Sequence, residues 1–116
     1  MNDDFSVSGE RLADDLGVVM LGGEVDIFTA PRFRECMVEL LDAGVRRLVV
    51  DLSDVTFIDS TALGVLIGGV RRVHNSGGAM VLVVVTRPVE RVLNVTGLDR
   101  VFSIRATRVE ALDALA

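Results

Sequence analysis

The stretch from Val55 to Gly64, near the middle of the chain, sets the strongest limit on what this sequence can fold into. The apolar run 47–52 leads towards it and is typical of a buried strand. Beyond it, apolar residues recur at the three- and four-residue spacing of an amphipathic helix, at Leu63, Leu66, Ile67, Val70 and Val73. We therefore predict a strand–helix joint here, with Ser60 at the N-cap. In open α/β sheets, ligands and partners meet the fold at this end of the strands.

The rest of the chain alternates between the two periodicities. Strands are predicted at 5–8, 18–21, 47–52, 79–85 and 101–104, and helices at 31–43, 61–74, 88–96 and after the capping box Thr107–Glu110. Val109 and Leu112 are expected on the buried face of the last helix. The order β-β-α-β-α-β-α-β-α predicts one α/β domain over residues 1–116. Its mixed, mostly parallel sheet has about five strands, with about four helices, and the first strand lies at an edge.

Several glycines mark places where the backbone needs room or an unusual conformation. Residues 10–17 are expected to form a turn or hairpin connection, and Gly22-Gly23 to end the second strand with a bulge or a close backbone approach. Gly64, Gly68 and Gly69 lie inside a helix, where each costs up to ~1 kcal/mol relative to Ala. Either the helix packs closely on its own sheet, or another molecule packs on the helix; both interpretations stay open.

Charge and cysteine content narrow the class of function. The net charge of −5 argues against nonspecific nucleic-acid binding, and the pairs Arg46-Arg47 and Arg71-Arg72 are interpreted as solvated surface. Cys36 shares a helical face with Phe33 and Met37, so it is predicted to be a packed thiol. The N-terminus 1–4 lacks a cationic signal region, and no apolar run reaches the ~18 residues of a membrane span. We expect a cytoplasmic protein without nucleic-acid or membrane partners.

Enzyme chemistry finds little support in the sequence. The only histidine, His74, lies at the far end of the helix from Ser60, and the chain has no lysine to replace it as a base. One Cys and one His cannot form a zinc site. Three carboxylates near the central loop are candidate weak Mg²⁺ ligands, though a plain turn is favoured: Asp51, Asp54 and Asp59. A P-loop is absent. We therefore predict no catalytic activity, no metal and no cofactor.

Ser60 is the remaining residue whose side chain is a candidate for a chemical role. The simpler interpretation is a capping hydroxyl, worth ~1 kcal/mol. The alternative is a phosphate acceptor, because a phosphate would meet free N–H groups and the positive end of the helix dipole. It would add about −1.5 to −2 charges beside Asp59. From the residues alone both stay open. If Glu24 and Asp26 end the neighbouring strand, the rim around Ser60 is already acidic.

The motifs resemble those of the bacterial anti-sigma factor antagonists, which are single STAS domains. The resemblance runs from about Phe5 to Leu115. Its most specific part is the segment 59–64, read as Asp-Ser-Thr-Ala-Leu-Gly, within the longer match 49–64. The segments Gly22-Gly23-Glu24-Val25-Asp26, Thr29-Ala30 and Val95-Thr96-Gly97-Leu98 support it.

The resemblance implies a partner-switching regulator. The family's phosphorylated serine falls on Ser60, and the kinase is the anti-sigma factor itself, a serine kinase of the GHKL type. The unphosphorylated antagonist binds that partner and frees a sigma factor, and a PP2C-type phosphatase reverses the modification. The family's conserved Asp falls on Asp26, which by resemblance shapes the site, while Asp59 and Thr61 flank the acceptor.

A larger set of residues is expected to bind the partner: Glu24, Asp26, Asp59, Thr61, Ala62 and Gly64. The sequence departs from the family at Ala62, where the family usually has Gly, and the extra methyl group is expected near the approaching kinase. Two alternatives are a STAS subunit of a stress-signalling or lipid-transport complex and a small nucleotide-binding protein. The missing P-loop counts against the second of these.

Overall fold

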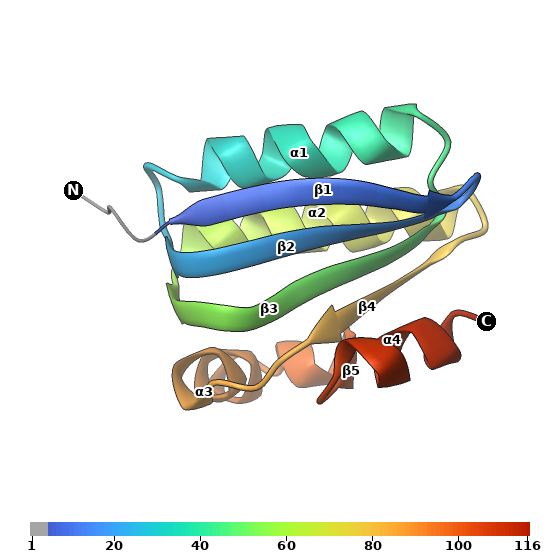
Figure 1. The fold of residues 1–116 in the computed structure, drawn as a ribbon. Helices are drawn as coiled ribbons and strands as arrows, with labels where there is room; N and C mark the ends of the chain where they lie inside the picture. The colour runs from blue at the N-terminus through green and yellow to red at the C-terminus, as the bar shows by residue number, and fades with distance from the viewer. Residues whose placement is uncertain (1–4) are drawn as a thin grey trace.

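The computed structural model describes residues 5–116, in which four helices pack on a five-stranded sheet (Figure 1). The acidic residues 1–4, considered above as evidence against a signal peptide, lie outside this range. The strands are β1 (Ser6–Ala13), β2 (Leu16–Val25), β3 (Arg47–Ile58), β4 (Ala79–Val83) and β5 (Ser103–Arg105). The helices are α1 (Ala30–Asp42), α2 (Ser60–Asn75), α3 (Arg87–Val95) and α4 (Arg108–Ala114), with a 3-10 turn at Leu98–Arg100.

The strands lie in chain order across the sheet. β1 is an edge strand antiparallel to β2, and β2 to β5 are parallel neighbours. The predicted α/β class, element order and edge position of the first strand are confirmed. Among the described residues no helix is both long and apolar enough to cross a membrane.

The central strand is buried on both faces, as its continuous apolar run predicted. Leu48 and Val50 belong to the core beneath α1 and α2, whereas Val49, which points the other way, belongs to a smaller core beneath α4. Figure 1 shows α1 and α2 on one side of the sheet and α4 on the other. Full burial of a Val or Leu side chain stabilises the fold by ~1.5–3 kcal/mol.

β2 and β3 both continue beyond their predicted ends, and their pairing there contains two register shifts. Met20 faces Asp51 but Gly22 faces Asp54, and Gly23 faces Val55 but Glu24 faces Phe57, so each shift places an extra residue in β3. Gly23 has φ 78°, a conformation that favours glycine. The glycines therefore mark irregular pairing, as predicted, but they do not end β2, and β3 runs on past Leu52 to Ile58.

Other predicted boundaries were also too short or misplaced. β1 and β2 reach into the predicted connection 10–17, and only 14–15 turn the chain. β4 stops at Val83, and β5 starts at Ser103. In α4 the buried residue is Ala111, and Leu115, directly after the helix, is also buried. Val109 is 68% exposed, so its predicted burial is wrong, and Leu112 is half-buried.

The helical glycines divide between the two interpretations left open. A Cβ on Gly69 would lie 2.6 Å from the Met37 sulfur, so this glycine allows α2 to pack on α1. A Cβ on Gly64 or Gly68 would meet no atom within 4 Å. These two glycines leave an open strip on the solvent side of α2.

Asp59, not Ser60, is the N-cap of α2. Its backbone is extended, and its carboxylate accepts the N–H of Ala62 at 3.0 Å. Ser60 is the first helical residue and is exposed. Both residue types favour N-caps. The pairing of β2 with β3 decides between them: the Asp59 N–H still donates to Val25 O at 3.2 Å, so the extended conformation continues through residue 59.

This assignment predicts different stabilities for two neighbouring alanine substitutions. Asp59→Ala removes the capping bond and is expected to lower the free energy of unfolding by about 1 kcal/mol. Ser60→Ala removes an exposed hydroxyl and should change it by less than about 0.5 kcal/mol. Urea unfolding of both variants measures the difference. A larger loss of unfolding free energy in Ser60→Ala than in Asp59→Ala would indicate that Ser60, not Asp59, caps the helix.

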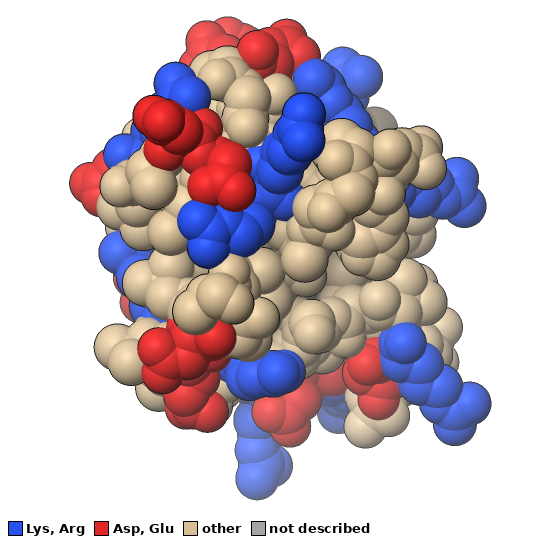
Figure 2. All heavy atoms as spheres, turned by 90° about the vertical axis from the view of Figure 1, so that its right-hand side faces the viewer, with Lys and Arg blue, Asp and Glu red and all other residues tan. Residues whose placement is uncertain are grey.

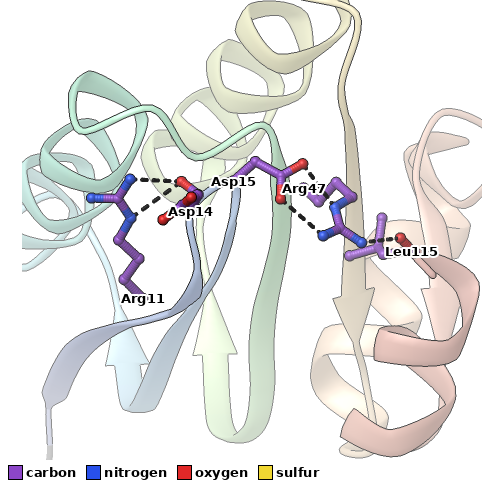
Figure 3. Close-up of polar contacts among 5 residues, drawn as sticks. All are labelled: Arg11, Asp14, Asp15, Arg47 and Leu115. Carbon is purple, nitrogen blue, oxygen red and sulfur yellow. Dashed lines mark hydrogen bonds and ion pairs between the residues drawn. The ribbon is translucent and has the colours of Figure 1, made fainter.

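Arg47 connects three parts of the chain (Figure 3). It begins β3, whereas Ser60 follows the end of that strand, so the two residues lie at opposite ends of β3. The Arg47 guanidinium donates to the Asp15 carboxylate at 2.9 and 3.0 Å and to the Leu115 carbonyl at 2.7 Å. The half-buried Arg47 is therefore a structural residue, not the solvated one that was predicted. Arg46, Arg71 and Arg72 are exposed, as expected. Figure 2 views the end of the molecule at which β3 begins and shows acidic and basic side chains intermingled over it.

The half-buried Asp51 holds α4 against the sheet from the middle of β3. Its carboxylate accepts from Ser53 N at 3.0 Å, from the Ser53 hydroxyl, and from Arg108 at 3.0 and 3.2 Å. Burial pushes the pKa of Asp51 upward, but the bonds from Ser53 and Arg108 outweigh it and leave that pKa below its ordinary value.

Because the pKa of Asp51 is lowered in the folded state, its ionised form stabilises the fold above the unfolded pKa of ~3.9, and that stability is lost as the pH falls through the folded value. Arg108→Gln is expected to raise the pKa of Asp51 and to move acid destabilisation to higher pH. NMR titration of the Asp51 carboxyl carbon measures the shift. Arg100→Gln, at an exposed position, is the control. An unchanged Asp51 pKa in Arg108→Gln would contradict this.

Candidate functional site

The joint between β3 and α2 presents Ser60 to solvent. Ser60 is exposed, and its hydroxyl forms no hydrogen bond with any residue of the range 5–116. The cap provided by Asp59 frees the serine from that structural task. An unengaged hydroxyl at the first position of a helix, beside helical N–H groups, is chemically suited to accept and hold a phosphoryl group.

The β2–α1 loop lies beside this joint and is held by its own side chains. The Asp26 carboxylate accepts the N–H of Phe28 at 2.9 Å, the N–H of Thr29 at 3.1 Å and the Thr29 hydroxyl at 3.2 Å. The Thr29 hydroxyl also lies 3.0 Å from Glu24 O and accepts from Asp26 N at 2.9 Å. Asp26 therefore fixes the shape of the loop, a role consistent with the resemblance.

The two strand ends bring acidic residues to one rim, as the sequence anticipated. Val25 pairs with Ile58, and Glu24 pairs with Phe57, so the segments 24–26 and 57–60 lie side by side. Glu24 and Asp54 are exposed, whereas Asp26 and Asp59 are half-buried. We call the residues Glu24, Asp26, Asp59 and Ser60 the acidic rim.

A groove runs between α1 and α2 next to the acidic rim. Its volume is about 560 Å³, and it is lined by Ala30, Pro31, Arg34, Glu35, Val38, Glu39, Thr61 and Val65. Thr61, the residue after Ser60, therefore faces the groove between the helices. The groove is mixed in character, with apolar side chains flanked by Arg and Glu, which suits a protein surface better than a small apolar ligand.

Ala62 and Gly64 occupy very different surroundings. Ala62 is 1% exposed and belongs to the core beneath α1 and α2. Its methyl group faces inward, so the expectation that this group meets an approaching kinase is wrong. Gly64 is exposed and has open space where a Cβ would lie. Of the predicted partner-binding residues, Ala62 alone is buried.

The candidate metal and catalytic groups do not come together. Of the three candidate Mg²⁺ ligands, Asp51 is bound to Ser53 and Arg108, and Asp59 accepts the N–H of Ala62. Within residues 5–116 no group of three or more His, Cys, Asp and Glu side chains is placed to hold a metal ion. His74 is exposed at the far end of α2. Burial raises the pKa of Cys36, which keeps it a thiol, as expected for a packed cysteine.

Sequence reasoning missed the exposed apolar residues near the ends of β2 and β3. Phe28 is 86% exposed and Ile27 62% exposed in the β2–α1 loop, and Phe57 is 46% exposed on β3. A signal was present, because Ile27 and Phe28 lie between two elements and fit the periodicity of neither. Apolar residues in such a position have no predicted core to enter.

Comparison with known proteins gives one consistent result. Residues 11–111 match the STAS domain family. The chain is 36% identical over 104 residues to a putative anti-sigma factor antagonist of Thermotoga maritima, covering 89% of this chain and 92% of the relative. It is also 36% identical over 88 residues to the anti-sigma-B factor antagonist of Bacillus subtilis, covering 76% of this chain and 80% of the relative.

The likeness extends to three dimensions. The crystal structure of an anti-sigma factor antagonist from Mycobacterium paratuberculosis superposes with a TM-score of 0.87 at 29% identity, covering 97% of this chain and 95% of that one. The matched family, the relatives and the five-stranded fold agree with one another. This chain belongs to the STAS domain family.

Proposed function

We propose that this chain is an anti-sigma factor antagonist whose binding is switched off by phosphorylation of Ser60. The observation that carries the proposal is the exposed, unbonded hydroxyl at the β3–α2 joint. The relatives named anti-sigma factor antagonist, which match over most of their length, support this function over a stress-signalling or lipid-transport role. The binding partner is an anti-sigma factor that is also a serine kinase of the GHKL type.

The unphosphorylated chain offers the acidic rim and the start of α2 as its binding surface. Glu24, Asp59 and Thr61 contact the partner, and the open strip at Gly64 lets it approach the helix closely. Asp26 acts indirectly by holding the β2–α1 loop. Occupation of the anti-sigma factor by this surface releases the sigma factor. This proposal needs no catalytic group on the antagonist itself.

Phosphorylation acts through charge and size at the centre of that surface. A phosphoserine adds about −1.5 to −2 charges and three acceptor oxygens. The helix N-terminus favours negative charge by ~0.3–1 kcal/mol, so the fold tolerates the phosphate. A partner that is complementary to the acidic rim, in contrast, meets excess charge and a bulky group. We therefore propose that binding is lost without unfolding and that a PP2C-type phosphatase restores it.

The phosphorylation site is tested directly by incubating the chain with ATP and each candidate GHKL-type anti-sigma factor from the same genome. Mass spectrometry is expected to place one phosphate on Ser60. Ser60→Ala should remove the modification, and Thr61→Ala should retain it. Phosphate on Thr61 or another residue in the wild-type chain would refute the site.

The switch is tested separately by binding. Ser60→Glu is expected to weaken the affinity for the anti-sigma factor by at least about tenfold, because a bulkier, charged side chain must then be desolvated at the centre of the interface without a matched partner group. Ser103→Glu adds the same charge at an exposed position of β5 and should bind as the wild type does. Isothermal titration calorimetry measures both affinities. Equal affinity of Ser60→Glu and the wild type would contradict the electrostatic switch.

A further inference from the structure

Exposed apolar side chains lie near or just beyond the carboxyl ends of three neighbouring strands. Ile27 and Phe28 follow β2, Phe57 is the second-last residue of β3, and Val85 follows β4 at 56% exposure. A large apolar side chain that stays in water contributes ~1.5–3 kcal/mol less to the stability of the fold than a buried one. Clustered exposure of this kind, beside polar residues, marks interaction sites more often than isolated apolar residues do.

Phe28 is the most exposed of these side chains, and its backbone is held in place. The Asp26 carboxylate accepts the N–H groups of Phe28 and Thr29, at 2.9 and 3.1 Å. The loop also closes on itself through Asp26 O, which accepts from Thr29 N and from Ala30 N at 2.7 Å. An aromatic group on a loop held in this way loses little conformational freedom on binding. The loop therefore has the properties of a preformed binding anchor.

The loop is joined directly to the site of the proposed switch. Val25 O, at the end of β2, accepts the N–H of Asp59, the residue before Ser60. Glu24 pairs with Phe57 across the same two strands. Ile27 and Phe28 consequently lie at the same end of the sheet as the phosphate acceptor, whereas Phe57 lines a hollow beside α3.

We infer that Phe28 is the aromatic anchor of this chain, inserted into an apolar pocket of the anti-sigma factor beside Ser60. This inference rests on the proposed function and adds a residue that binds the partner. Buried aromatic residues near the centre of an interface typically contribute the largest share of its energy. Phosphorylation then places charge next to an apolar contact that stabilises the complex only when water is excluded from it.

The charge around Phe28 identifies the occupant as a protein with a basic surround. Glu24 lies near the end of β2 and Asp59 directly after β3, and Asp54 lies farther back on β3, opposite Gly22. The chain as a whole carries −5. Anionic lipid surfaces attract basic segments and would repel this rim. A partner pocket with an apolar floor and cationic edges complements both the aromatic ring and the acidic residues.

Alanine substitution tests the anchor on the full chain. Phe28→Ala is expected to weaken binding to the anti-sigma factor that phosphorylates this chain by at least about tenfold, because anchor residues usually cost more than a tenfold loss. Val109→Ala, on α4 at 68% exposure, is the matched control and should bind normally. Since Phe28 is 86% exposed, the urea unfolding midpoint of Phe28→Ala should stay at the wild-type value.

A fluorescence measurement gives an independent result, because the chain contains no tryptophan. Phe28→Trp introduces a single reporter whose emission should shift to shorter wavelength when the anti-sigma factor is added, whereas the emission of Val109→Trp should not shift. Difference spectra remove the contribution of any partner tryptophan. If the emission of Phe28→Trp does not shift when the anti-sigma factor is bound, residue 28 stays exposed in the complex and the inference is overturned.

The remaining outcomes separate this inference from the proposed function. If the wild type binds an anti-sigma factor and Phe28→Ala binds equally well, the anchor is refuted and the antagonist function stands. If the wild type binds none of the candidates, both fail. If Phe28→Ala only abolishes a dimer seen by ultracentrifugation, or only abolishes binding to phosphatidylglycerol vesicles, the occupant is a second copy or a lipid, and the inference is overturned.

Discussion

The parallel pairing of β2 with β3 is the constraint on which the rest of the structure depends. It places Val49 and Val50 in two separate cores, and it carries the chain through two register shifts to Val25 and Ile58. The hydrogen bond from Asp59 N to Val25 O is the last link of this pairing. Because of it, Asp59 remains extended and caps α2, and Ser60 enters the helix with its hydroxyl free.

The same pairing gives the surface its mixed character. Two strand ends and the loop that follows β2 bring carboxylates, an exposed aromatic ring and a helix N-terminus to one rim. The helix N-terminus stabilises added negative charge, whereas a partner fitted to the rim does not. A single phosphate can therefore leave the fold intact and still change binding. The half-buried Asp51 shows how the other face is secured, through Arg108 on α4.

The sequence was sufficient for the architecture because periodicity and burial agree locally. The apolar runs of β3 and β4, the spacing in α2 and the Thr107 cap all predicted elements that form. The end of β3 was missed because Asp51, Ser53 and Asp54 interrupt the apolar run. The Asp51 carboxylate is bound by Ser53 and by Arg108, which lies far along the chain, and Asp54 is exposed where β3 pairs irregularly with β2. Such compensation cannot be seen in a local pattern.

The site was predictable in position but less so in detail. Asp59 and Ser60 are both good caps, so only the course of the strand decides between them. The inward direction of the Ala62 methyl and the outward direction of Phe28 depend on how α2 and the β2–α1 loop sit on the sheet. The periodicity of α2 had, however, already placed Leu63 and Leu66 inside, and Ala62 lies on the same side.

The most direct test of this account is chemical-shift mapping of the isotopically labelled chain as the anti-sigma factor is added. The account predicts perturbations confined to residues 24–29 and 57–64 and to the neighbouring groove, with none on β1 or α4. It also predicts that the chain phosphorylated at Ser60 keeps its folded spectrum and shows no such perturbations at the same partner concentration. Perturbations centred on α4 or β5, or equal perturbations for both forms, would contradict it.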